Sequence, residues 1–429
     1  MRSISAAQLW WRAARAAGID AVYGEPLDLF DVTRVPPAIA PTFAAAHHRV
    51  HGHRAAVHLG QGIVVLPGLD AGSRRVMEVG SATALIDALA ELGDAGEVEL
   101  RLALSPDEPV EDIVPAFAPS NDAWPEPHPD DSALLRAAAS AVILAGPGVI
   151  ECGAVTGLHD LAVSAGLGVL NTWGAKGVFH WRSQHHLATV GLQADDFILG
   201  GLADVDLVIS SGLNQSESPD WRWQLGPPTL RIEPAALASF AEQSGPRRSA
   251  PAMPVLRARL ADVTQRGWSS PEVPIPPSRI TLHYAERLAE GALIAADAGT
   301  AGYWVARTLG TSRLGAVIVP STNWPGYAAA CIAVALLRRP SQPALAVIDG
   351  PADEATMTIL EAAATLGVHV PVEAWDPAGE RLDATSHRDR LRTLVLGGTP
   401  QTAGPSTLAT DPDQLAQMID AAGAIVAWS

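Results

Sequence analysis

The sequence has only two cysteines, Cys152 and Cys331, which stand far apart and lack the spacing of metal ligands. Neither a disulfide scaffold nor a structural zinc site is therefore expected. Basic residues are also scarce, because the 429 residues hold 29 Lys and Arg against 46 Asp and Glu, a net charge of −17. Nucleic acid is not expected as the main partner, since phosphate backbones are bound by basic surfaces. A small anionic cofactor is still compatible with this charge, since it needs only local backbone N–H groups or a metal ion.

Long hydrophobic runs are missing as well. The longest apolar stretch, residues 326–337, is alanine-rich and falls short of the roughly 20 residues of a membrane-spanning helix. Residues 1–18 carry three arginines and no continuous apolar segment, so we expect no secretory signal. Hydrophobic residues nevertheless make up 48% and charged residues 17% of the chain, the reverse of a disordered composition. We expect a soluble, cytoplasmic protein with a large buried core.

Two proline-rich stretches divide the chain. Residues 118–131 are dense in Pro, Asp and Ser, and residues 269–279 contain four prolines. Such runs are typical of domain boundaries, because proline interrupts both helices and sheet pairing. They predict three domains, at residues 1–120, 132–268 and 280–429.

Short apolar segments alternate with helical patterns in all three parts. The patterns predict strands at residues 19–24, 62–68, 140–148, 167–174, 204–212, 291–299, 344–350 and 368–375, and helices at 5–18, 155–166, 325–339 and 354–367. This alternation indicates βαβ units, and so three consecutive α/β domains with mainly parallel sheets. Ligands of such sheets bind at the carboxyl ends of the strands. Glycine-containing turns stand there, at residues 146–148, 297–299 and 349–350.

The order of these segments resembles the thiamine-diphosphate-dependent enzymes of the acetolactate synthase and benzoylformate decarboxylase type. The similar segments are residues 10–27 in the first domain, 141–179 and 201–212 in the second, and 297–309, 323–337 and 344–350 in the third. The resemblance spans most of the chain, and no single motif is complete. It identifies the chain as a divergent, shortened relative.

The resemblance implies a pyrimidine-binding, a central and a diphosphate-binding domain, with thiamine diphosphate and Mg²⁺ as cofactors. It implies cleavage or formation of a carbon–carbon bond in a 2-oxo acid or 2-hydroxyacyl compound. Gly24 and Pro26 fall at cofactor-binding positions of the first domain. Asp349 and Gly350 fall in the metal motif, and Asp376 at the position of the second Mg²⁺ ligand.

The chain departs from that family at both ends of the cofactor. The family's helix glutamate, which hydrogen-bonds the pyrimidine ring, is replaced at about His48 by an imidazole, a poor substitute for a carboxylate. In the metal motif Asp376 replaces an asparagine and Ile348 a glycine, while Pro351 removes an N–H donor.

Three functions are consistent with these residues. The first is an active thiamine-diphosphate/Mg-dependent carboligase or lyase, with His48 as a catalytic residue and Asp349 and Asp376 as metal ligands. The second is a degenerate subunit with weak or no cofactor binding, acting as a structural or regulatory partner of an intact paralogue. The third, nucleotide binding by the central domain, has little support, because the turn at residues 146–148 lacks a full Gly-x-Gly-x-x-Gly.

Several candidate residues also have plain structural interpretations. Five histidines stand between residues 47 and 58, and they suit a metal or proton-relay site, a cofactor contact, or a polar helix at a subunit interface. Asp349 and Asp376 each begin a turn. Asp297 stands in another turn at a strand end, and Lys176 in a Gly-Lys-Gly-like turn is interpreted as a loop charge.

Because the family's site lies between subunits, we expect a homodimer or homotetramer, or a hetero-oligomer with an intact paralogue.

Overall fold

The computed structural model describes residues 3–26, 32–66, 75–90, 98–103, 105, 107–112, 128–244, 252–396 and 405–428. The chain divides into two compact units. The first contains residues 1–121, 329–340 and 354–369, and the second contains residues 122–328, 341–353 and 370–429. Sheets of parallel strands alternating with helices confirm the predicted α/β class.

The first unit is built on a mixed six-stranded sheet, ordered β3-β2-β4-β5-β7-β6. Its strands are β2 (Ile19–Gly24), β3 (Thr33–Arg34), β4 (Arg54–His58), β5 (Ile63–Leu66), β6 (Arg75–Val79) and β7 (Val98–Leu102). A separate antiparallel pair joins β1 (Ser3–Ser5) and β8 (Pro109–Glu111). The helices of this unit are α1 (Ala6–Ala16), α2 (Ala40–His51), α3 (Ala82–Ala90), most of α13 (Tyr327–Arg338) and α14 (Glu354–Thr365).

Helix α1 shows why the predicted elements form. Ser5 and Gln8 make a reciprocal capping box at its start, which satisfies two backbone N–H groups that have no partner within the helix. Leu9 and Trp10 are buried in the core of this unit, as the helical spacing of the apolar residues predicts. Gly18 follows the helix with φ 80°, a conformation that glycine adopts at little cost.

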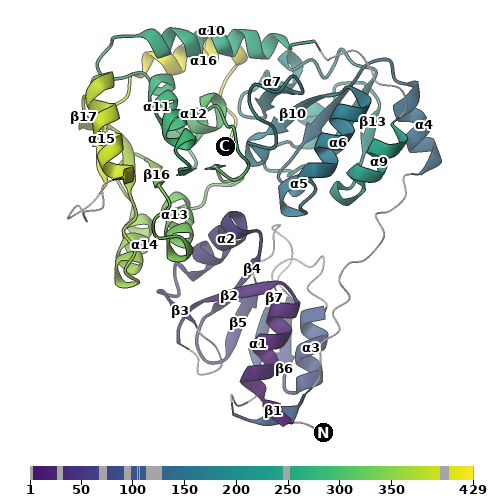
Figure 1. Ribbon diagram of the computed structural model, residues 1–429, viewed down its shortest axis with the longest axis vertical. Helices are drawn as coiled ribbons and strands as arrows, with labels where there is room; N and C mark the ends of the chain where they lie inside the picture. Colours follow the sequence, from purple (N-terminus) through teal and green to yellow (C-terminus); the bar gives the residue numbers. More distant parts are fainter. Residues whose placement is uncertain are drawn as a thin grey trace. The chain divides into compact units, whose positions relative to one another are not determined.

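The second unit holds two five-stranded sheets, both entirely parallel. The central sheet, ordered β11-β10-β9-β12-β13, consists of β9 (Ala141–Ala145), β10 (Gly168–Thr172), β11 (His186–Val190), β12 (Leu207–Ser211) and β13 (Thr229–Arg231). Its helices are α4 (Pro129–Ala137), α5 (Gly148–Glu151), α6 (Val155–Ala165), the 3₁₀ turn η1 (Trp173–Ala175), α7 (Asp196–Leu199), α8 (Asp220–Trp223), η2 (Pro234–Ala236) and α9 (Leu237–Gln243). Helices α6 and α9 lie side by side over this sheet (Figure 1).

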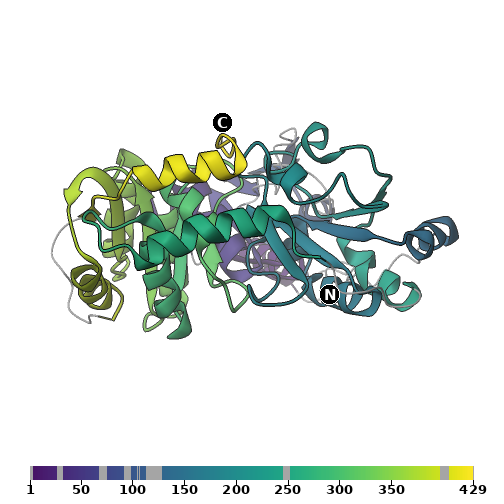
Figure 2. The ribbon, with the colours of Figure 1, turned by 90° about the horizontal axis from the view of Figure 1, so that it is seen from above.

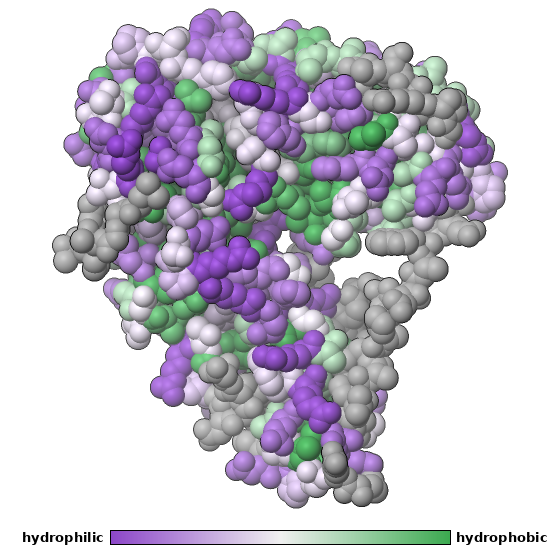
Figure 3. Space-filling model, in the orientation of Figure 1, coloured by the Kyte–Doolittle hydropathy of each residue, from purple (hydrophilic) through white to green (hydrophobic). Residues whose placement is uncertain are grey.

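The third sheet is ordered β15-β14-β16-β17-β18. It consists of β14 (Leu293–Ala296), β15 (Val317–Ile318), β16 (Ala344–Asp349), β17 (Val372–Glu380) and β18 (Ser406–Leu408), with α10 (Val255–Ser269), α11 (Pro277–Ala289), α12 (Thr300–Thr308), α15 (Ala384–Leu396) and α16 (Asp413–Ala422). Helix α10 runs beside α16 (Figure 2). Hydrophilic residues cover the face over α15 in Figure 3, in agreement with the charged residues of that helix.

Most of the predicted elements are present, with small shifts at their ends. The last predicted strand, residues 368–375, begins four residues later, at Val372. The proline-rich segment 269–279 connects α10 to α11, and its Ile275 is buried in the core of the third sheet. The other predicted linker, 118–131, lies largely outside the described residues, so the division into three domains stays a prediction. Within the described ranges, no helix has both the length and the apolar character needed to cross a bilayer.

Candidate cofactor site

The carboxyl ends of β14 and β16 bring two aspartates to the same edge of the third sheet. The strands pair in parallel with Ala296 opposite Val347, and the N–H of Asp297 donates to the carbonyl of Val347 at 3.0 Å. Asp297 and Asp349 are therefore neighbours at the position where parallel sheets bind ligands.

Asp349 uses its side chain to cap helix α12. Its Oδ2 accepts a hydrogen bond from the N–H of Thr300 at 2.8 Å, and its Oδ1 accepts one from the N–H of Ala301 at 3.4 Å. Gly299 precedes the helix with φ 111°, and a Cβ there would lie only 2.3 Å from Asp349 Oδ2. The carboxylate thus fills the position at which a helix N-terminus attracts an anion. Burial raises the Asp349 pKa, although the two N–H donors oppose this shift.

Asp297 is the second carboxyl group at this edge. Its Oδ1 accepts a hydrogen bond from the N–H of Ala328 at 2.7 Å. Burial raises the pKa of Asp297 to about 7, and the nearby carboxylates of Asp353 and Asp349 contribute to the rise. Among the described residues, no Lys or Arg forms an ion pair with Asp297 or Asp349.

Gly350 and Asp376 lie at the same edge of the sheet. Asp349 pairs with Trp375 of β17, and the Gly350 N–H donates to the Trp375 carbonyl at 2.8 Å. Asp376 follows directly, but its Oδ1 accepts from the N–H of Ala378 at 2.9 Å, the local turn that the sequence allowed. The two predicted metal ligands therefore lie on the neighbouring strands β16 and β17, Asp349 opposite Trp375 and Asp376 directly after it, each with a carboxylate oxygen bonded to backbone.

The predicted residues of the first domain, Gly24, Pro26 and His48, lie in the first unit. Gly24 ends β2 with φ 127°, and a Cβ there would fall 2.1 Å from the carbonyl oxygen of His58. Pro26 is exposed. His48, on α2, has a buried Nδ1 without a hydrogen-bond partner, and burial together with the Arg54 charge lowers its pKa. The close approach of β4 is therefore enough to explain why a glycine stands at position 24, without any contact to a cofactor.

The histidine cluster is largely committed to internal hydrogen bonds. The hydroxyl of Tyr23 is 2.9 Å from His47 Nδ1, and His47 Nε2 is 2.6 Å from Asp20 Oδ1. The other carboxylate oxygen of Asp20 bonds Arg338 at 2.6 Å. This chain joins β2, α2 and α13 within the first unit. Burial lowers the pKa of His47 to about 4, so its ring is neutral near pH 7.

Two other histidines of the cluster also have protein partners. His51 Nε2 lies 3.4 Å from the carbonyl oxygen of Val334, and His58 Nδ1 donates to the carbonyl of Glu25 at 2.7 Å. No group of three or more His, Cys, Asp or Glu side chains suited to a metal ion is found in the part of the chain that the structure describes. The contacts agree with the structural interpretation of this helix.

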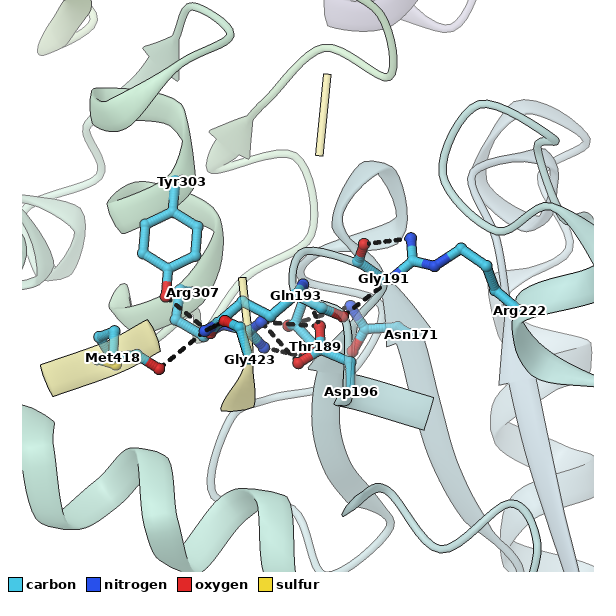
Figure 4. Close-up of polar contacts among 10 residues, drawn as sticks. All are labelled: Asn171, Thr189, Gly191, Gln193, Asp196, Arg222, Tyr303, Arg307, Met418 and Gly423. Carbon is cyan, nitrogen blue, oxygen red and sulfur yellow. Dashed lines mark hydrogen bonds and ion pairs between the residues drawn. The ribbon is translucent and has the colours of Figure 1, made fainter. Parts of the chain in front are cut away.

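A buried polar network that the sequence patterns did not predict spans the second unit (Figure 4). Arg307 donates to both oxygens of Asp196, at 2.8 and 2.7 Å, and both side chains are fully buried. Burial by itself lowers the pKa of Arg307, but the Asp196 carboxylate outweighs it and raises the pKa. Gln193 accepts from the Tyr303 hydroxyl at 2.8 Å. The network therefore ties α12 to the loop after β11.

Lys176 is buried beside this network and is not the loop charge that the sequence suggested. Its Nζ donates to the carbonyl of Ala306 near the end of α12 at 2.7 Å. Burial lowers the pKa of Lys176 to about 7, and the Arg307 cation lowers it as well. Composition gave no sign of this burial, because a Gly-Lys-Gly turn is typical of an exposed loop.

A second buried polar group, which the sequence patterns also did not predict, joins α11, β17 and α15. Glu373 Oε2 is 3.2 Å from His387 Nε2, and His387 Nδ1 is 2.7 Å from His283 Nδ1. The Tyr284 hydroxyl donates to Glu373. Burial and the neighbouring His387 lower the pKa of His283 to about 3. These residues come from three distant segments, so no local spacing could reveal the group.

Residues 132–233 match the family model described as thiamine pyrophosphate enzyme, central domain. The second unit contains a segment similar to that domain. The matched region is about a quarter of the chain and holds the whole central sheet, β9 to β13. It supports the predicted relationship to thiamine-diphosphate enzymes without indicating a subtype. A comparison with curated proteins gives no match.

Thiamine-diphosphate binding is a general property of the enzymes whose central domain this segment resembles, but the residues at the strand ends do not fit a magnesium-bound diphosphate. A diphosphate at the start of α12 would compete with the Asp349 carboxylate for the N–H groups of Thr300 and Ala301. It would also lie beside Asp297 and Asp353, whose charges repel it.

Proposed function

We propose that this chain is a relative of the thiamine-diphosphate enzymes that has lost autonomous cofactor binding, and that it acts as a structural or regulatory subunit beside an intact paralogue. The observation that carries the proposal is the Asp349 carboxylate, which accepts hydrogen bonds from Thr300 and Ala301 at the start of α12. These are the donors that an anion at a helix N-terminus requires.

The first unit supports the same function. In the family that the chain resembles, a helix glutamate contacts the pyrimidine ring, whereas here the position holds about His48. Burial and Arg54 lower the pKa of His48 and so disfavour its charged form, and neither the neutral nor the protonated ring supplies the negative charge of a carboxylate. Both ends of a thiamine cofactor therefore lack their expected partners.

A thiamine-diphosphate/Mg-dependent carboligase or lyase, acting like acetolactate synthase on a 2-oxo acid or 2-hydroxyacyl compound, is the second candidate. The family match over residues 132–233 favours it. So does the placement of Asp349 and Asp376 close together on the neighbouring strands β16 and β17, since Mg²⁺ prefers oxygen ligands. In this candidate Asp349 and Asp376 would hold the metal ion, and the cofactor would supply the electron sink.

Calorimetry separates the two candidates. The purified chain is titrated with thiamine diphosphate in the presence of Mg²⁺ at millimolar concentration. The proposal predicts no heat of binding. A saturable heat would refute the proposal by showing that the chain binds the cofactor by itself, and its loss in the Asp376→Ala variant would support Asp376 as a ligand of the metal ion.

A further inference from the structure

Lys176 is the only lysine of the chain, since the other 28 residues of the Lys and Arg total are arginines. Its side chain is buried, whereas lysine is almost never fully buried without an ionic partner. Arginine keeps its proton in proteins, but a lysine amine can lose its proton when it is buried. Of the 29 Lys and Arg side chains, the one that can become neutral therefore stands at a buried position.

The surroundings of the Lys176 amine favour its neutral form. Its Nζ donates to the carbonyl of Ala306 at 2.7 Å, and this is its one hydrogen bond to the described residues, although an ammonium group has three N–H donors. Among those residues no carboxylate pairs with the amine, and the charge that acts on it is the Arg307 cation. A buried ammonium group without a counterion is unfavourable.

The groups around Lys176 do not supply the missing negative charge. The Asp196 carboxylate of α7 is already held by two hydrogen bonds from Arg307 of α12 (Figure 4). His186, at the start of β11, is a titratable neighbour whose pKa is lowered by burial and further by the Lys176 charge. Arg257 of α10 bonds the carbonyl of His186. A proton on Lys176 therefore joins a group that already holds two arginine cations against one carboxylate.

Lys176 fastens the loop between β10 and β11, residues 173–185, to the end of α12. Ala306, which accepts its hydrogen bond, lies in the last turn of that helix. The same loop is docked again where the Trp181 N–H donates to the carbonyl of Thr311 at 2.9 Å. All these residues belong to the second unit. The Lys176 contact thus joins the central sheet to the third sheet within one compact unit.

We propose that Lys176 is a pH-sensitive switch, which holds the loop at residues 173–185 against α12 while its amine is neutral and releases the loop when the amine gains a proton. Opening of the loop transfers the amine to water, where its charge carries no burial cost. The closed loop is therefore favoured at high pH and weakened as pH falls. The switch does not involve Asp349 or a thiamine cofactor, so it is independent of the proposed function.

The direction of the pH effect follows from the proton affinities of the closed and opened loop. Burial, together with the Arg307 cation, lowers the Lys176 pKa from its ordinary 10.5 to about 7 in the closed loop. Between these two values the opened form binds more protons, so a fall in pH favours opening. The opening equilibrium is expected to rise by about fifty-fold from pH 9 to pH 7, and to level off below pH 7.

Hydrogen exchange of the Trp181 amide measures the opening, since its bond to Thr311 requires the closed loop. The full chain is compared at each pH with the Lys176→Met variant, which keeps the side-chain length without the amine, so that the intrinsic exchange rate cancels. The ratio of opening in the full chain to opening in the variant should rise by about fifty-fold from pH 9 to pH 7. Amides of β4, in the first unit, should show no such change.

Two results of this exchange experiment would overturn the proposal. One is a ratio that stays constant with pH. The other is exchange of the Trp181 amide only as slowly as the amides of β9, which would mean that the loop opens only when the whole sheet unfolds. Arg182→Gln, which replaces an exposed arginine of the same loop, is the matched control and should leave the pH effect unchanged.

A second measurement observes the amine itself and needs no variant. Acetic anhydride acylates neutral amines, and Lys176 is the one lysine that can react, so mass spectrometry of its peptide gives the rate without interference from other lysines. Because the closed form must lose its proton before the amine can react, the rate should titrate with a midpoint near pH 7. A midpoint near 10.5, the ordinary lysine value, would contradict the switch.

Discussion

The carboxylate of Asp349 accepts a hydrogen bond from the backbone N–H of Thr300 at 2.8 Å, and so connects the end of β16 to the start of α12. The residue that the family resemblance implies as a metal ligand therefore caps the N-terminus of α12 with its side chain. Each of its two oxygens already accepts one hydrogen bond from the start of this helix.

Replacing Asp349 by alanine is expected to destabilise the chain. The variant loses its hydrogen bonds to Thr300 and Ala301, and loss of a helix cap costs about 0.5–2 kcal/mol. Asp376→Ala is the matched control, because its carboxylate bonds only the nearby Ala378 N–H. Urea unfolding should show a smaller loss for the control. Equal losses in the two variants would argue against a capping role for Asp349.

A substitution at Gly299 also tests the contact between the Asp349 carboxylate and the start of α12. With φ at 111°, ψ at −156° and a Cβ position 2.3 Å from Asp349 Oδ2, Gly299→Ala should lower the free energy of unfolding by more than the roughly 1–3 kcal/mol of backbone strain alone. Gly80→Ala is the control, since a Cβ there meets nothing within 4 Å. It should change stability by no more than about 0.5 kcal/mol. A Gly299→Ala protein as stable as the Gly80→Ala control would contradict the close approach of the Asp349 carboxylate to residue 299.

The buried pair of Arg307 and Asp196 should be expensive to break. Asp196→Ala leaves an unpaired buried cation and is expected to cost about 3–5 kcal/mol. The double variant Asp196→Ala with Arg307→Met removes both charges and should recover part of that loss. Chemical denaturation of the two proteins gives the comparison. A double variant less stable than Asp196→Ala would refute this account of the pair.

Stability should fall as the solution becomes acidic. Burial lowers the pKa of His47 to about 4, and the pKa values of His186 and His283 to about 3. Between the ordinary histidine pKa of about 6.5 and these values, the unfolded chain binds more protons than the folded one. The free energy of unfolding must therefore decrease as pH falls through this window.

Asp297 acts in the opposite sense, because its folded pKa of about 7 lies above the usual aspartate value. Its contribution to stability is complete below about pH 4 and is lost as pH rises through 7. Asp297→Asn should remove this term and shift maximum stability to higher pH. Unfolding curves collected from pH 4 to 8 test both statements. A maximum that does not move in Asp297→Asn would contradict the assigned pKa.

Local features of the sequence predicted the elements well. The helical spacing of apolar residues over 5–18 predicted α1, and the apolar runs before Asp297 and Asp349 are the parallel strands of the third sheet. These signals are local, since periodicity, caps and turns depend on residues close in the chain.

The site could be predicted only in part, because it depends on distant contacts. The motif spacing of the family that the chain resembles paired Asp349 with Asp376, and the two lie on neighbouring strands, but the spacing could not show that the Asp349 carboxylate turns toward Thr300. The burial of Lys176 beside Arg307, which is 131 positions further along the chain, has no local signal at all. Nor could a pattern assign His47 to Asp20 rather than to a metal ion.

The most direct test is a crystal structure of the chain grown with millimolar thiamine diphosphate and Mg²⁺. We predict that Asp349 Oδ2 still accepts from the Thr300 N–H, with no diphosphate at the start of α12. Phosphate oxygens bonded to the N–H groups of Thr300 and Ala301, with Mg²⁺ between Asp349 and Asp376, would contradict the proposal and establish the chain as a thiamine-diphosphate-binding protein.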